Sequence, residues 1–277
     1  MNIKGKKKEL LTILIFLGLA FMFLQSVFPF YWMLVTSFKN KLQVYDASVW
    51  VFKPIFENYV KVFISKNFLK YLINSTVIAI FSVIISVFIG GLAAYGFARY
   101  QFKRKELYFF SLLALRMLPA IAFTIPYFII GRFTGVLDTH VILIIASLTF
   151  NLPFTVWMMR GFFEEIPKEL EESAKVDGCS TLQVLRLIVV PLAIPGITAT
   201  GIFALIYSWN EFVYALILTS RDAVTIPILS TLFTSVAGTS YGQLATVGVL
   251  ASTPILIFAM FVQKYMIRGL TFGAVKG

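Results

Sequence analysis

Long uncharged stretches dominate the chain and set its predicted architecture. The first runs from Leu10 to Phe38 without a charged residue. It exceeds the roughly 20 residues that a helix needs to cross a bilayer, and it is too long for the apolar region of a signal peptide. Six spans are expected, at residues 10–38, 71–98, 107–131, 141–159, 187–210 and 244–262, and only the third contains a charged residue, Arg116.

These spans predict an all-α integral membrane protein with six transmembrane helices. In lipid, backbone N–H and C=O groups must be satisfied within their own segment, as a helix does, and the alternating pattern of a membrane strand is absent. An even number of spans places both termini on one side of the membrane. On the second span Gly90, Ala94 and Ala98 recur every four residues, which suits close helix packing.

The overall composition supports a membrane location. Of the 277 residues 59% are hydrophobic and 13% are charged, which leaves too little polar side chain to cover a water-facing surface. The formal net charge of +11 does not indicate nucleic acid, because apolar runs separate the Lys and Arg residues instead of one stripe gathering them. We therefore expect a lipid bilayer around the chain and no nucleic-acid partner.

The distribution of Lys and Arg predicts the orientation. With a cytoplasmic N-terminus, 15 of these residues lie inside and 8 outside, and Arg116 lies in the membrane. The positive-inside rule favours this arrangement, although residues 39–70 place six lysines outside. We expect a cytoplasmic segment at residues 1–9, a transmembrane domain at 10–267 and a cytoplasmic tail at 268–277.

Cysteine and histidine each occur once, as Cys179 and His140. A single cysteine excludes an internal disulfide, and a His/Cys metal cluster cannot be assembled within the chain. Neither residue is expected to bind a metal.

Residues 160–186 differ from the rest of the chain, because they gather acidic residues between two spans. Pro167 sits where a helix begins, residues 168–176 favour a helix with Leu170, Ala174 and Val176 as candidates for one apolar face, and Asp177-Gly178 ends it. Thr181 restarts a helix toward the membrane. Two short helices around a glycine turn predict a projecting docking surface; an ordinary loop is the alternative. The acidic residues are Glu164, Glu165, Glu169, Glu171, Glu172 and Asp177.

This segment resembles the "EAA" signature of the permease subunits of ABC importers. The signature begins with Glu-Ala-Ala and has a Gly four residues after the second Ala. An I-x-L-P sequence starts ten residues after that Gly. Its spacing is kept throughout, with Ser173 in place of the first Ala and Val190 in place of Leu. The matching residues, which the resemblance makes the coupling site for an ATPase, are Glu172, Ser173, Ala174, Asp177, Gly178, Ile188 and Pro191.

The resemblance extends over most of the chain and points to the carbohydrate branch of these permeases. It includes Asn74-Ser75, Arg116-Met117-x-Pro119, Trp209-Asn210-Glu211-Phe212 and the Gly-Leu-Thr tail that begins at Gly269. Together these are similar to the second permease subunit of maltose-type importers. The tail is expected either to thread toward the ATPase dimer or to be disordered.

The resemblance also implies the partners and the place of action. These are a second permease in a heterodimer, an ATPase homodimer and an extracytoplasmic sugar-binding protein, in a bacterial or archaeal cytoplasmic membrane. The chain lacks the G-x-x-x-x-G-K-[ST] loop that cradles phosphates. It is therefore expected to be a non-enzymatic transport subunit without a cofactor of its own, while the partner ATPase binds ATP and Mg.

Candidate residues of the sugar path are Arg116, Trp209, Asn210 and Glu211. An Arg at membrane depth should face protein or water, so Arg116 either has a structural partner, lines the path, or marks a misplaced span. An aromatic ring such as that of Trp209 can stack on a sugar ring while polar neighbours bind the sugar hydroxyl groups, but tryptophan is also common at the membrane interface. Residues 235–242 resemble an external loop that reaches into the binding protein, or are a plain loop.

Two other classes are weighed against the importer reading. A secondary transporter would carry its own ion and substrate sites in paired halves, and no repeat of one half in the other is visible. A membrane enzyme would need a cluster of catalytic groups near a membrane surface, and the acidic cluster here has the spacing of a docking segment. The first would transport when expressed alone, and the second would act without a partner.

Overall fold

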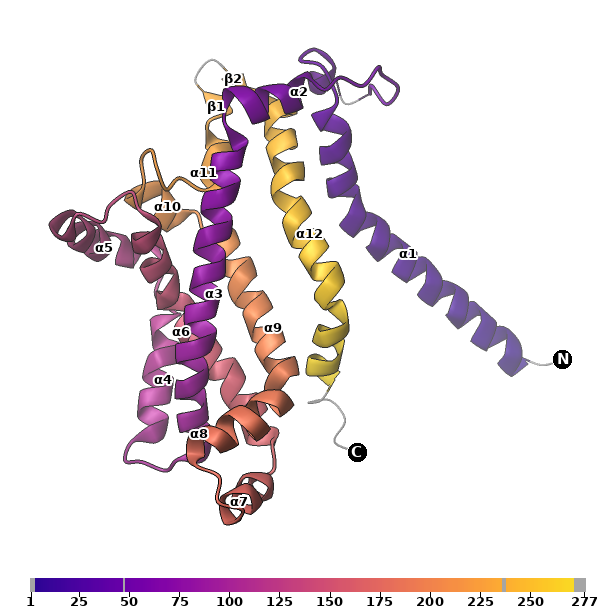
Figure 1. Cartoon of the computed structure of the whole chain (residues 1–277). Helices are drawn as coiled ribbons and strands as arrows, with labels where there is room; N and C mark the ends of the chain where they lie inside the picture. The colour runs from indigo at the N-terminus through magenta and orange to yellow at the C-terminus, as the bar shows by residue number, and fades with distance from the viewer. Residues whose placement is uncertain (1–2, 47, 236–237, 272–277) are drawn as a thin grey trace. The chain divides into compact units, whose positions relative to one another are not determined.

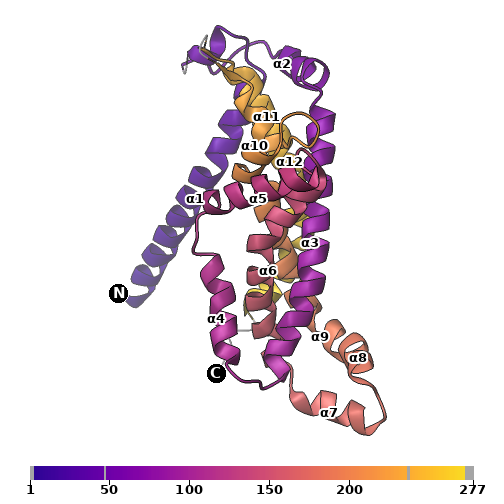
Figure 2. The same ribbon diagram turned by 90° about the vertical axis from the view of Figure 1, so that its left-hand side faces the viewer.

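The computed structural model describes residues 3–46, 48–235 and 238–271, and it is almost entirely helical. The contacts divide the chain into two units: Met1–Phe68 with Ser230–Thr253, and Leu69–Leu229 with Pro254–Gly277. The structure is drawn in Figures 1 and 2.

The first unit combines two long helices with short elements between them. A two-stranded antiparallel pair, with Thr234 opposite Thr239, is a small departure from the expected all-α fold. The elements are α1 (Ile3–Ser37), the 3₁₀ turn η1 (Gln43–Tyr45), α2 (Glu57–Val60), the π turn η2 (Lys61–Ser65), β1 (Thr234–Ser235), β2 (Gly238–Thr239) and α12 (Tyr241–Thr271), which continues into the second unit.

The second unit contains the central helices. In both views α3, α6 and α9 run alongside one another (Figures 1 and 2), and α6 and α9 pack together. The elements are α3 (Phe68–Arg99), α4 (Lys105–Leu115), α5 (Ile121–Thr134), α6 (His140–Glu165), α7 (Lys168–Val176), α8 (Thr181–Val184), the π turn η3 (Leu185–Val189), α9 (Val190–Trp209), α10 (Val213–Leu218) and α11 (Ile226–Thr231).

Five helical stretches of the described residues are long and apolar enough to cross a membrane. They are Leu11–Ser37, Phe68–Arg99, His140–Glu165, Thr181–Trp209 and Tyr241–Met260. These match five of the six expected spans. The ends differ: α1 begins at Ile3, so most of the expected N-terminal segment is helical, and α12 reaches Thr271. Residues 272–277 of the expected tail lie outside the described residues.

The expectation of one continuous helix over residues 107–131 is wrong. The segment forms α4 and α5, which have 11 and 14 residues, too few at about 1.5 Å per residue to cover the roughly 30 Å of a bilayer core. Pro119 causes the break, because it has no N–H and disfavours helical geometry at Leu118. The N–H groups of residues 116–118 instead donate to the carbonyls of residues 113–115, three positions earlier, as in a 3₁₀ helix.

Small residues allow α3 to lie very close to α6, as expected from the sequence. Ala94 and Ala98 are buried in a cluster with Met159 and Phe163. At Gly90, an added Cβ would lie 2.8 Å from Cγ2 of Thr155. The glycine is therefore required by the closeness of the two helices.

We predict that Gly90→Ala destabilises the chain by about 1–3 kcal/mol, because the methyl group overpacks the contact with Thr155. Gly96 on the same helix is the matched control, since a Cβ there meets nothing within 4 Å. Thermal unfolding of the purified protein in detergent should show a lower midpoint for Gly90→Ala and an unchanged or higher one for Gly96→Ala. Equal midpoints for the two variants would contradict the close contact.

Candidate functional site

The 160–186 segment forms two short helices at one end of the second unit. In both views α7 and α8 lie beyond the ends of α6 and α9 (Figures 1 and 2). Gly178 ends α7 with a φ of +90°, a conformation that residues with a Cβ rarely adopt. The N–H of Cys179 donates to Ala174 O (2.9 Å) and that of Gly178 to Lys175 O (3.1 Å). These two bonds form a Schellman cap, so the predicted break at Gly178 is confirmed.

The next helix begins with a capping box. Ser180 N donates to Oε1 of Gln183 (2.7 Å), and Gln183 N donates back to Ser180 Oγ (3.4 Å). The helical stretch from Thr181 then continues to Trp209 through the π turn Leu185–Val189. This wider turn lies directly before Pro191, which has no N–H to donate. The two short helices are therefore ordered by local hydrogen bonds, as a docking surface requires.

A buried carboxylate attaches α7 to the end of α3. Arg99 Nε donates to Oε1 of Glu171 (2.5 Å), and the Tyr95 hydroxyl donates to Oε2 (2.7 Å). Arg99 also donates through Nη2 to the carbonyl of Ile166 (2.9 Å), in the link between α6 and α7. The side chains of Arg99 and Glu171 are only 7% and 5% exposed. Removing one partner of such a pair typically costs about 3–5 kcal/mol, because the other charge stays buried.

The orientation of α7 differs from the expected apolar face. Ala174 is buried, but Leu170 is 45% and Val176 is 88% exposed. The three residues therefore do not share one buried face, because the hydrogen bonds of Glu171 turn its side of the helix toward α3. A pattern of apolar residues alone missed Glu171; the signal was an acid three residues before Ala174, on the same helical face.

The residues of the expected coupling site divide between two surfaces. Ala174 packs in the cluster with Ala94 and Phe163, and Ile188 packs against it. The other five, Glu172, Ser173, Asp177, Gly178 and Pro191, are exposed. Val176 (88%) and Leu182 (71%) are also exposed, so the outer surface of the 160–186 segment carries both acidic and apolar side chains.

A second charge network joins α4 to α6. Arg160 donates to both carboxylate oxygens of Glu106 (3.0 and 2.9 Å) and to Glu164 (2.7 Å). Its guanidinium carbon also lies 4.2 Å from the ring centroid of Phe109. The bidentate pair fixes the start of α4 against the last turns of α6.

Arg116 lies at the break between α4 and α5 and is exposed. Its guanidinium carbon stands 4.8 Å from the ring centroid of Phe154 on α6, a cation–π contact. Arg116 thus has an aromatic partner within the chain, while its side chain still reaches the surface.

The three remaining path candidates have different surroundings. Trp209 is buried at the end of α9. The side-chain amide of Asn210 donates to Ile206 O of its own helix (2.8 Å). The carboxylate of Glu211 accepts from the N–H groups of Tyr214 (2.8 Å) and Ala215 (3.1 Å), in the first turn of α10. Glu211 thereby satisfies backbone donors at a helix start, so its geometry is that of a structural cap.

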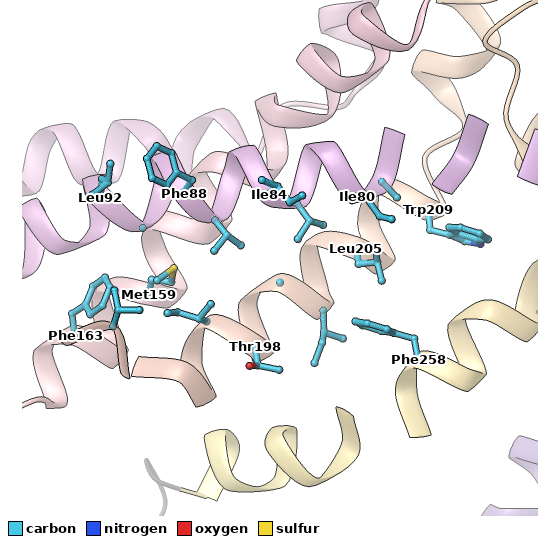
Figure 3. Close-up of a pocket in the computed structure, with 18 of the residues that line it drawn as sticks. Ile80, Ile84, Phe88, Leu92, Met159, Phe163, Thr198, Leu205, Trp209 and Phe258 are labelled. Carbon is cyan, nitrogen blue, oxygen red and sulfur yellow. The ribbon is translucent and has the colours of Figure 1, made fainter. Parts of the chain in front are cut away.

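An apolar groove of about 1000 Å³ runs along α3 and α9 (Figure 3). Of the four path candidates, Trp209 alone lines it. The residues with polar side-chain atoms in its lining are Thr76, Arg186, Thr198 and Trp209. Such a surface offers little to the hydroxyl groups of a sugar and suits the apolar side chains of another helix or lipid. Its walls include Ile80, Ile84, Phe88, Leu92, Leu205 and Phe258.

The sequence pair Asn74-Ser75 holds a loop at the start of α3. Asn74 Nδ2 donates to the carbonyls of Asp222 (2.8 Å) and Val224 (2.9 Å), while Ser75 Oγ accepts from Ile226 N (2.9 Å). Asn74 Oδ1 also lies 2.8 Å from Nε2 of His140. The polar pair noticed in the sequence therefore fixes the backbone of residues 222–226.

Asp138 organises the same loop from the other side, and sequence reasoning missed it. It sits at φ +57° before α6, and its carboxylate accepts from four successive N–H groups at distances of 2.9–3.1 Å. Burial acts to raise the pKa of Asp138, but these N–H donors outweigh it and lower the pKa to about 2. The donors belong to residues 220–223.

The fold and these sites define an α-helical protein that crosses a membrane several times. Residues 86–272 match the family of binding-protein-dependent transport system inner membrane components, and the chain belongs to that family.

Curated relatives span nearly the whole chain. It is 36% identical over 258 residues to the trehalose transport system permease protein SugB of Mycobacterium tuberculosis, covering 91% of this chain and 93% of the relative. It is 33% identical over 276 residues to the trehalose/maltose transport system permease protein MalG of Thermococcus litoralis, covering 98% and 99%. The expected resemblance to importer permeases is thus confirmed.

A solved structure shows the same fold. One chain of a bacterial ABC transporter involved in the import of the acidic polysaccharide alginate superposes with a TM-score of 0.78. The alignment covers 94% of this chain and 98% of that chain at 22% identity. At this identity the likeness concerns the fold.

We predict that Asp138→Asn destabilises the chain by roughly 1–2 kcal/mol at neutral pH, because an amide accepts fewer of the backbone N–H bonds. Since the folded pKa is lowered from 3.8 to about 2, this stability is present above pH 4 and is lost as the pH falls toward 2. Unfolding midpoints in detergent should therefore converge between wild type and variant in that range. Asp222→Asn, whose side chain is 72% exposed, is the control and should change little.

Proposed function

We propose that this chain is the permease subunit of an ATP-driven importer and translocates a sugar, of disaccharide or oligosaccharide size, across the cytoplasmic membrane. The observation that carries the proposal is the near full-length similarity to trehalose and maltose permeases. The ordered 160–186 segment supports it, because a subunit without its own ATP site needs a surface that receives movement from a partner.

The outer surface of the 160–186 segment is the proposed docking site for an ATPase homodimer that binds ATP and Mg. Exposed Val176 and Leu182 supply apolar contact area, and Glu172 and Asp177 supply charge. Apolar side chains at the tip of a projection have no role in stabilising this chain, so a partner surface is the natural place for them. Hydrolysis itself is assigned to the partner.

A second permease subunit is the proposed occupant of the apolar surfaces. The groove along α3 and α9 has few polar groups, and α1 exposes large side chains such as Phe16 (68%) and Phe21 (67%). A second helical subunit and lipid together would cover these surfaces, as in a heterodimer. An extracytoplasmic sugar-binding protein completes the proposed complex, which agrees with the family description.

For the topology we propose six spans, with α4 and α5 together forming the third as a broken helix. Residues 1–9 and 268–277 are then cytoplasmic, 10–267 form the membrane domain, and the 160–186 segment faces the ATPase. Non-helical backbone at membrane depth is typical of transport sites, where it lines a cavity. A reporter fused after Gly277 should be active only in the cytoplasm; external activity would contradict six spans.

The α4–α5 break makes Arg116 the favoured path candidate of the four. Its exposed guanidinium lies where the helix is interrupted, and such groups bind hydroxyl oxygens. Trp209 remains a candidate through its place in the groove, whereas Asn210 and Glu211 bond to backbone of their own chain. These two are proposed to shape the path rather than to contact the sugar.

The decisive experiment is reconstitution in liposomes with a sister permease, an ATPase and a binding protein from the same organism. Uptake of labelled trehalose or maltose should require both ATP and the binding protein. Uptake by this chain alone, driven by an ion gradient, would instead establish a secondary transporter. Uptake of neither sugar would limit the proposal to the importer class, and a sugar panel bound to the binding protein would then name the substrate.

We predict that Gly178→Val leaves the chain inserted in the membrane but abolishes ATP-driven uptake and weakens ATPase binding. The reason is the φ of +90° at Gly178, where a β-branched residue is strained although the surrounding space is open. Gly178→Asn should retain most activity, because Asn tolerates positive φ. Gly161→Val, in the open surface of α6, is the control.

Cys179 gives a second readout of the same surface. It is the only thiol and is half-buried beside Gly178. In inside-out vesicles a membrane-impermeant maleimide should label it, and bound ATPase should slow the labelling. Normal uptake by Gly178→Val, together with labelling only from the opposite face, would refute the coupling assignment.

A further inference from the structure

We propose that the buried group of Glu171, Arg99 and Tyr95 is the rigid link through which movement of the 160–186 segment reaches α3. This inference rests on the proposed function, in which an ATPase moves that segment. It assigns Arg99, Tyr95 and Glu171 as positioning residues for transport, separate from the outer surface that meets the ATPase.

The chain itself connects α7 only to α6 and, through α8 and η3, to α9. The helix α3 is distant in sequence: Arg99 and Glu171 are 72 positions apart. A push on α7 therefore moves α6 and α9 through covalent bonds, but it moves α3 only through side-chain contacts. Near Ala94 and Ala98 the packing of α3 against α6 is apolar, and the hydrogen bonds at the end of α3 connect it directly to α7.

The geometry of the group suits a stiff connection. Both oxygens of Glu171 are held from α3, one by Arg99 and the other by Tyr95, which lie four residues apart on one helical face. Arg99 at the same time holds the carbonyl of Ile166, so a single guanidinium joins α3, α7 and the end of α6. Three directed hydrogen bonds fix the position of α7 far more narrowly than apolar contact alone.

Burial keeps water from replacing these bonds. Glu171 is 4% exposed, and the cluster around it contains Ala94, Ala98, Phe163 and Ala174. The adjacent Glu172 is exposed. Two neighbouring carboxylates thus have different positions: Glu171 attaches α7 inward to α3, and Glu172 remains on the surface offered to the partner.

Movement of α3 has a direct consequence for the groove. Ile80, Ile84, Phe88 and Leu92 of α3 line it over much of its length (Figure 3). A shift of α3 with α7 therefore changes the surface that the groove offers to the proposed sister subunit. The link provides a physical route from the ATPase to the helix interface.

The test compares uptake with ATP consumption in the reconstituted complex of all partners. For Glu171→Ala and Arg99→Ala we expect the ATPase to stay bound and ATP hydrolysis to continue, while sugar uptake per ATP falls at least tenfold. Tyr95→Phe, which removes one hydrogen bond, should lower the ratio about threefold. The exchange Arg99→Glu with Glu171→Arg should recover part of it, since the ion pair is restored without the bonds to Tyr95 and Ile166.

Exposed residues on the same elements are the controls. Glu169→Gln on α7 and Lys103→Gln after α3 remove similar charges at the surface and should keep the wild-type ratio. They separate the effect of the buried link from a general change in charge.

The outcomes distinguish the link from other roles. A ratio within twofold of wild type in Glu171→Ala overturns the link. Loss of uptake in proportion to loss of bound ATPase also overturns it, because the group then only supports docking. If the alanine variants do not insert into the membrane, Tyr95→Phe provides the test, and an unchanged ratio of sugar uptake to ATP hydrolysis in this variant overturns the link. Failure of the wild-type chain to bind any ATPase would refute the proposed function itself and would be seen before any variant is compared.

Discussion

The absence of water around the apolar helices is the constraint on which the structure depends. Backbone groups in such surroundings must be satisfied within a helix, so the polar networks gather where helices end or break. Asp138 and Asn74 fix the loop after α10 at the start of α3 and α6, while Glu171 and Arg160 tie the opposite helix ends together. The break at Pro119 divides an expected span into two helices, and the exposed Arg116 lies at this break.

The 160–186 segment has an exposed outer surface and is firmly attached on its inner side. A projection of two short helices would be marginal by itself, since helices of this length are unstable in water. The Schellman cap at Gly178, the capping box at Ser180 and the buried carboxylate of Glu171 supply the missing order. Apolar residues such as Val176 can then remain exposed and available to a partner.

The groove along α3 and α9 is lined mainly by apolar side chains. Its lining is nearly all apolar, so it offers few hydrogen-bond partners to the hydroxyl groups of a sugar. The large apolar area along α3 and α9 suits the apolar side chains of another helix or of lipid.

The sequence by itself determined the membrane class, five of the spans and the helix break at Gly178. Uncharged length and motif spacing are properties of a single segment, and Gly178 fulfilled its predicted role because a turn is local. The tertiary structure decided which way α7 faces, that Glu171 and not Leu170 is buried, and that Glu211 caps α10. It also decided that residues 107–131 divide at Pro119. The sequence shows this proline, but Pro126 and Pro153 remain inside helices, so a proline alone does not predict a break. Hydrogen bonds between residues far apart in the chain, such as Arg99 with Glu171, leave no periodic pattern, and so only the folded arrangement shows them.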